Sequence, residues 1–159
     1  MVRTTSLHTD WLDLLRCLTN HQVRFLMIGG HAVSLHSEPR YTEDLDLFVE
    51  ATLANGRRRR KALVEFGLGN VAPKPEELAK PGPFWMFGRK PIRIDLLTEI
   101  PAVSSFRAAW KGRVEVEIDG IMVPVIGRED LIANKRGAGR TKDLADVESL
   151  VRFPANEHE

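Results

Sequence analysis

The chain has 159 residues and carries 23 Lys and Arg against 22 Asp and Glu, for a formal net charge of +1. Hydrophobic residues make up 43% and charged residues 28%, which is typical of a globular protein with a buried core. The near-zero net charge argues neither for nor against a nucleic-acid partner. We expect one domain over residues 1–159, with its core at about 22–152 and an N-terminal helix at about 9–21.

The single cysteine, Cys17, excludes an internal disulfide framework and is typical of a reducing compartment. The histidines and this cysteine show no zinc-ligand spacing. No apolar run reaches the roughly 20 residues of a membrane-spanning helix, and the N-terminus lacks the apolar core of a signal peptide. We therefore expect a cytoplasmic protein without a membrane partner.

The spacing of apolar residues predicts the first half of the chain. Residues 9–21 carry apolar side chains every three or four positions, which predicts a helix capped by Thr9 or Asp10. The apolar segment that follows ends on two glycines and predicts a buried strand entering a tight turn. In chain order we then expect a short helix at 31–37, a second strand at 44–50 and a helix at 51–69.

The second half is expected to begin with an irregular, proline-rich segment at residues 71–83. After it we expect strands at 84–88 and 91–100, a short helix at 104–112, a hairpin around Asp119–Gly120 and closing helices at 128–136 and 141–153. Because the later strands are grouped as hairpins, we expect an α/β fold with a mixed sheet rather than a doubly wound parallel one.

Three aspartates interrupt strands that are otherwise apolar. Asp44 and Asp46 alternate with leucines, so their carboxylates lie side by side on one face of the predicted strand. Asp95 lies in the middle of a later apolar strand, and it joins the other two if the strands are neighbours. Unless this face is an open strand edge, such carboxylates require a metal ion or a basic partner. Carboxylates together with substrate phosphates are the ligands that Mg²⁺ prefers.

A glycine pair, Gly29 and Gly30, stands between a predicted strand and a predicted helix. Without a Cβ, these residues let backbone N–H groups at the start of a helix approach a phosphate. Alone, such a pair is more often a simple turn. The nearby aspartates favour a phosphate site.

These residues resemble the nucleotidyltransferase superfamily of the DNA-polymerase-β type. The shared pattern is a strand that ends in Gly29–Gly30, then Asp44–Leu45–Asp46, then Asp95 on a later strand. The closer resemblance is to small bacterial nucleotidyltransferases related to the AbiEii toxins. Their pattern "R-x-T-x-D-[LI]-D" matches Arg40, Thr42, Asp44 and Asp46, and their "DL…K…R..KD..D…L" matches "EDLIANKRGAGRTKDLADVESL". The resemblance covers about residues 25–150.

The resemblance implies a nucleotidyltransferase fold, with a mixed β-sheet flanked by helices, and an enzyme that moves a nucleoside monophosphate from an NTP to an acceptor hydroxyl. It implies Mg²⁺ or Mn²⁺ held by three catalytic residues, Asp44, Asp46 and Asp95. It implies nucleotide contacts at Gly29, Gly30, Arg40, Thr42, Lys135 and Asp143. A serine often follows the first glycine in relatives, whereas this chain has Gly30. The acceptor could be tRNA, a protein or a small molecule, and a cognate antitoxin is a candidate partner.

Several residues keep alternative interpretations. Lys135 is either a triphosphate ligand or a surface lysine, and Asp143 is also explained as an acid at a helix N-terminus. Arg40 either binds an anion or partners the acid cluster of Asp44, Asp46 and Asp95. Arg57–Lys61 could meet an RNA backbone, although such runs are mostly solvated. The aromatics at 84–87 could stack a base, although packing against a core is more common. The second hypothesis is therefore a non-catalytic interaction protein, either a toxin–antitoxin component or an RNA-binding module.

Overall fold

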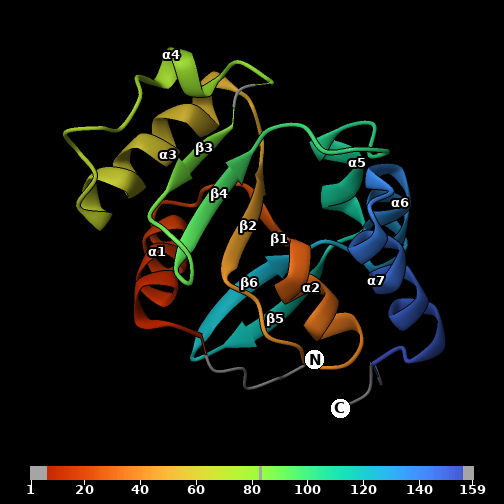
Figure 1. Cartoon of the computed structure of the whole chain (residues 1–159). Helices are drawn as coiled ribbons and strands as arrows, with labels where there is room; N and C mark the ends of the chain where they lie inside the picture. Colours follow the sequence, from red (N-terminus) through yellow and green to blue (C-terminus); the bar gives the residue numbers. More distant parts are fainter. Residues whose placement is uncertain (1–6, 83, 156–159) are drawn as a thin grey trace.

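A computed structural model describes residues 7–82 and 84–155, and it contains a six-stranded mixed sheet with helices packed around it (Figure 1). The described helices are α1 (Thr9–Asn20), α2 (Gly29–His36), α3 (Leu53–Phe66), α4 (Pro75–Leu78), α5 (Phe106–Lys111), α6 (Arg128–Ala138) and α7 (Thr141–Arg152). The strands are β1 (Phe25–Ile28), β2 (Asp44–Val49), β3 (Trp85–Phe87), β4 (Arg93–Leu97), β5 (Val114–Ile118) and β6 (Ile121–Val125). The expected α/β class with a mixed sheet is confirmed.

The strand order is β3-β4-β2-β1-β6-β5. Three pairs are antiparallel, namely β1–β2, β3–β4 and β5–β6, whereas β2–β4 and β1–β6 are parallel. The segment that contains α3, α4 and β3 is inserted between β2 and β4, yet these two strands are direct neighbours. This topology is what brings Asp95 beside the strand that carries Asp44 and Asp46.

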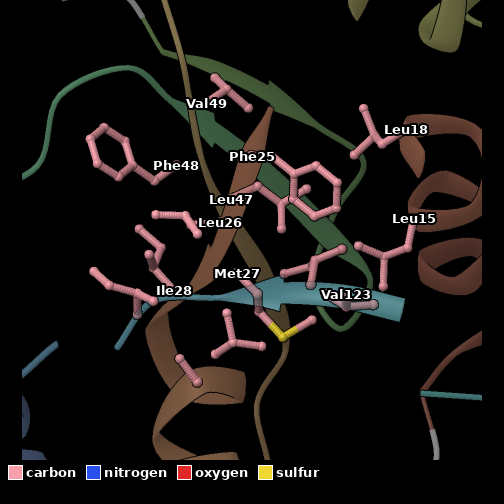
Figure 2. Close-up of a cluster of buried hydrophobic side chains, with 14 of the residues drawn as sticks. Leu15, Leu18, Phe25, Leu26, Met27, Ile28, Leu47, Phe48, Val49 and Val123 are labelled. Carbon is pink, nitrogen blue, oxygen red and sulfur yellow. The ribbon is translucent and has the colours of Figure 1, made fainter. Parts of the chain in front are cut away.

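The core lies around β1, whose side chains are all buried. Phe25, Leu26 and Met27 of this strand are 0% exposed. Figure 2 shows them packed among side chains of β2, with Leu15 and Leu18 of α1 alongside. Burying side chains of this size contributes about 1.5–3 kcal/mol each, so β1 and β2 form a rigid base for the residues at their ends.

The structure confirms the predicted hairpin turn but gives the first helix a different N-terminal cap. The predicted hairpin turn is confirmed, since Asp119 and Gly120 have φ values of 47° and 80°, as a two-residue type I′ turn requires. The first helix is capped by His8 instead of Thr9 or Asp10. His8 Nδ1 accepts a hydrogen bond from the Asp10 backbone N–H at 3.1 Å, because an imidazole nitrogen can accept as a carboxylate does.

The basic run Arg57–Lys61 on α3 is less solvated than expected. Arg59 is only 1% exposed, and its Nη1 donates to the Leu78 carbonyl at 3.2 Å. Arg60 Nη1 donates to the Ala72 carbonyl at 3.0 Å. These bonds tie α3 to the proline-rich segment, which also contains the short helix α4 and is not wholly irregular. No helix in the described part of the chain is long and apolar enough to cross a bilayer.

Candidate active site

Two carboxylates of β2 and one of β4 lie on the same face of the sheet. In the parallel β2–β4 pair, Asp46 is opposite Asp95 and Asp44 is opposite Arg93. The residue between the two β2 aspartates, Leu45, is 0% exposed and points to the other face. The expectation that the Asp95 strand lies beside the strand of Asp44 and Asp46 is therefore confirmed.

Gly29 brings the start of α2 against Asp46. Its φ is +68°, and a Cβ at this position would lie 2.3 Å from Asp46 Oδ2. A side chain here would meet both backbone strain and a clash, so the close approach depends on glycine. The N-terminus of α2, with its unpaired N–H groups and positive dipole end, is next to the carboxylates and suits an anionic ligand nearby.

The environment of Asp46 favours its protonated form. Burial, the neighbouring charge of Asp95, a hydrogen bond between the two acids and the charge of Asp44 together raise the pKa of Asp46 to about 7, against the opposing effect of Lys135. Like charges held close cannot both ionise without cost. At neutral pH Asp46 can therefore take up or release a proton.

Arg93 is the basic partner that the carboxylates require. Its Nε lies 3.3 Å from Asp44 Oδ1, and its Nη2 donates to Asp95 Oδ2 at 3.2 Å. The sequence analysis missed this residue. Its position two residues before Asp95 on a strand was a usable signal, because alternate strand residues share a face.

The carboxylate oxygens suit a hard divalent cation, although the site is not a preformed metal shell. Asp44 Oδ1 and Asp95 Oδ1 are buried and receive no hydrogen bond from an N–H group. Carboxylate oxygens are the ligands that Mg²⁺ and Mn²⁺ take. Among residues 7–82 and 84–155, however, no three acid, histidine or cysteine side chains are grouped closely enough to hold a metal ion. Arg93 bridges Asp44 and Asp95, so metal binding there requires its guanidinium to move.

Lys135 on α6 is buried, and the surface interpretation of this residue is wrong. It is 5% exposed, and its Nζ lies 3.3 Å from Asp143 Oδ1 and 3.0 Å from Asp146 Oδ2. Asp146 also pairs with Arg40, so the acid that Arg40 partners lies on α7 and is not one of the three strand aspartates. The sequence analysis did not single out Asp146, although it lies one helical turn after Asp143 on the same face of α7.

Asp143 is 0% exposed and holds the start of α7 together. It accepts a hydrogen bond from the Arg140 backbone N–H at 3.2 Å and from Arg140 Nε at 2.6 Å. Burial alone would raise the pKa of Asp143, but the hydrogen bonds from Arg140 and the charge of Lys135 outweigh it and hold the pKa below its ordinary value. The helix-terminus interpretation of Asp143 is confirmed by this geometry, and its predicted nucleotide contact stays a prediction.

A cavity of about 580 Å³ opens over the carboxylates. Six predicted site residues line it: Gly29, Asp44, Asp46, Asp95, Lys135 and Asp143. Residues that the sequence analysis did not assign to the site add positive charge, namely Arg93, Arg140 and Lys142. The structure thus gathers acids, cations and the glycine turn around one space large enough for a nucleotide.

The other predicted nucleotide contacts, Gly30, Arg40 and Thr42, do not line this cavity. A Cβ on Gly30 would lie 2.9 Å from Arg40 Nη2 and 3.1 Å from Thr42 Oγ1, so the three residues are packed together. Arg40 and Thr42 line a separate cavity of about 690 Å³ with His31. Their role as nucleotide ligands stays a prediction.

The mixed sheet, the glycine turn and the acids on adjacent strands define the chain as a nucleotidyltransferase domain. The chain belongs to the family described as "Nucleotidyl transferase AbiEii toxin, Type IV TA system", whose model matches residues 13–159. A comparison with curated proteins found no match.

Proposed function

We propose that this chain is a divalent-metal-dependent nucleotidyltransferase that moves a nucleoside monophosphate from an NTP to an acceptor hydroxyl and releases diphosphate. The observation that supports this best is the pairing of Asp46 with Asp95 at the foot of the cavity, beside the Gly29 turn. Two opposed carboxylates, of which Asp46 has a pKa of about 7, next to an anion-binding helix end suit phosphoryl chemistry.

In the proposed reaction the acceptor oxygen attacks the α-phosphorus and forms a new P–O bond, while the bond between the α-phosphorus and the bridging oxygen breaks. The diphosphate carries the electron pair away, and the hydroxyl proton passes to a carboxylate. Asp95 is our candidate for receiving that proton, because it is opposite Asp46 and lines the cavity in which the acceptor would lie.

Mg²⁺ or Mn²⁺ would be held by Asp44, Asp46 and Asp95 only after Arg93 leaves them and the three carboxylates move closer together than they are in this structure. When bound, such an ion polarises the acceptor oxygen and neutralises charge that develops on the leaving diphosphate. Arg93, freed from its carboxylate partners, would remain close to the phosphates as a fixed positive charge.

The cations of α6 and α7 differ in how free they are to bind the triphosphate. Lys135 is already compensated by Asp143 and Asp146, so its main contribution is to position these helices and the cavity wall. Arg140 lines the cavity but is paired with Asp143, whereas Lys142 is exposed and lines the cavity, so Lys142 is better placed to bind the leaving diphosphate.

An RNA-binding module built on Arg57–Lys61 is less well supported. Arg59 and Arg60 are committed to backbone carbonyls of the following segment, which leaves Arg57 and Lys61 as the exposed cations of this run. A hollow of about 650 Å³ beside them contains the charged side chain of Glu65 as well. We propose no acceptor beyond a hydroxyl-bearing molecule. Because the family description refers to toxin–antitoxin systems, a neighbouring gene is where a cognate antitoxin should be sought.

The reaction class can be tested with NTPs that carry the label on either the α- or the γ-phosphate, incubated with the protein, Mg²⁺ and cell extract. Nucleotidyl transfer places the α-label, and not the γ-label, on an acceptor. Transfer of the γ-label would instead indicate a kinase-type reaction, and transfer of neither label would support the non-catalytic alternative.

A further inference from the structure

The cavity over the carboxylates has an apolar wall that phosphate binding does not explain. Its cationic part, with Lys135, Arg140 and Lys142, suits the triphosphate. The apolar part combines Phe84 and Met86 with Leu97, Ile100 and Pro101. Both parts belong to one space of about 580 Å³.

The apolar wall begins on β3, which lies at the edge of the sheet next to β4 (Figure 1). Trp85 and Phe87 pack against the core, whereas Phe84 and Met86 are 57% and 53% exposed. Met86 is directly opposite Asp95 in the antiparallel β3–β4 pair, so the two side chains share a face. Phe84, the residue just before β3, lines the same cavity as Met86 and Asp95. Two large apolar side chains exposed beside buried carboxylates are typical of a ligand site.

We propose that Phe84 and Met86 form the surface on which the base of the NTP stacks, an inference that rests on the proposed nucleotidyl transfer. An NTP combines an anionic triphosphate with a flat ring system that has two apolar faces. The cavity supplies cations for the first and an aromatic ring with a thioether for the second. Both the aromatic ring and the polarizable sulfur make favourable contacts with a π-system.

This wall contacts the face of the base more than its edge. The side-chain amide of Asn134, which also lines the cavity, donates to the Pro101 carbonyl at 3.0 Å. Stacking tolerates any base, because every base has a π-face. Stacking on an aromatic side chain differs only modestly between bases, so this surface favours both purine and pyrimidine NTPs.

The test compares ATP, UTP and inorganic tripolyphosphate by titration calorimetry in Mg²⁺. Phe84→Ala weakens ATP and UTP binding by about 5- to 150-fold, the range for losing one base–aromatic stack, and leaves tripolyphosphate binding unchanged. Phe84→Tyr keeps the ring and keeps the affinity. Phe153→Ala is the matched control, since Phe153 is 51% exposed and lies outside the cavity. Thermal melting of each variant verifies that the fold is retained.

The outcomes separate this inference from the proposed function. Selective loss of NTP affinity in Phe84→Ala supports the stacking surface. If Phe84→Ala binds ATP as tightly as the wild type, or if the wild type binds ATP no better than tripolyphosphate, the stacking surface is wrong while the phosphate site stands. If the wild type binds neither ATP nor tripolyphosphate, both the stacking surface and the proposed function are wrong.

Discussion

Asp46 and Asp95 are opposed on the parallel strands β2 and β4, close enough for the two acids to share a hydrogen bond. Because both lie on a partly buried face, their mutual repulsion raises the pKa of Asp46 to about 7 after burial itself has raised it. Arg93 offsets part of the remaining charge through Asp44 and Asp95. Acids whose pKa values are raised by burial and by neighbouring charges are typical of functional sites.

The first prediction concerns Asp46→Asn and pH. Between about pH 4 and 7 the folded wild type binds a proton at Asp46 that the unfolded chain has already lost, so its stability falls as pH rises through this window. The asparagine side chain does not titrate, so the variant lacks this pH dependence. The gain in unfolding free energy from Asp46→Asn should therefore be larger at pH 8 than at pH 5, by on the order of 2 kcal/mol.

Urea denaturation at both pH values measures this difference, with Asp13→Asn as the control at an exposed site. His31 has a pKa lowered to about 4 by burial and the charge of Arg40, and its stability contribution falls as pH drops below 6.5. That opposite slope is present in wild type and variant alike and cancels in the comparison. A variant effect that is the same at both pH values would show that Asp46 is ionised throughout.

Gly29→Ala tests the close approach of the glycine turn to Asp46. The new Cβ would lie 2.3 Å from Asp46 Oδ2 at a φ of +68°. Gly120→Ala is the control, because its φ is +80° and a Cβ there would meet no atom within 4 Å. Both variants should lose about 1 kcal/mol or more from backbone strain, and Gly29→Ala alone should also lose NTP binding. If the two variants bound NTP equally well, the Gly29 turn would not be part of the NTP-binding site.

Lys135→Ala should destabilise the protein, because it leaves Asp143 and Asp146 without their buried cation. Removing one partner of a buried ion pair costs about 3–5 kcal/mol. Arg136→Ala, which removes the next, exposed cation on the same helix, should cost little. Denaturation experiments that give the unfolding free energy of each variant test this prediction. A loss below about 1 kcal/mol for Lys135→Ala would contradict the buried network.

The basic run of α3 offers a test of the RNA-binding alternative. Arg59→Leu should destabilise the protein, because the bond to the Leu78 carbonyl is lost. Arg57→Glu with Lys61→Glu changes only exposed charges and should leave the melting temperature and the affinity for tRNA almost unchanged. A large, salt-dependent loss of tRNA binding in this double variant would favour the interaction protein.

Much of the fold could be predicted from local sequence patterns, because each pattern reports on its own segment. The glycine pair between β1 and α2, the alternation of Asp44 and Asp46 along β2, and the Asp119–Gly120 turn were predicted in this way. From the sequence, Asp95 joins Asp44 and Asp46 only if β4 lies beside β2, and the sequence did not establish that pairing. The two strands pair across an inserted segment, which no local pattern encodes.

The charged residues were harder to predict than the apolar ones. Lys135 and Arg59 have the appearance of surface residues on helices, but both are buried because partners distant in the sequence satisfy them. A basic partner for the carboxylates was expected, but the sequence alone did not identify it as Arg93. For such residues the decisive information is the identity of a long-range partner, and that comes only from the tertiary structure.

The most direct test of the central claim measures transfer of α-labelled nucleotide to an acceptor in cell extract, with Mg²⁺, for the wild type, Asp46→Asn and Asp13→Asn. The account predicts transfer by the wild type and by Asp13→Asn, and a loss of at least about 100-fold in Asp46→Asn while its fold is retained. Wild-type turnover in Asp46→Asn would contradict the assignment of this carboxylate to the chemistry.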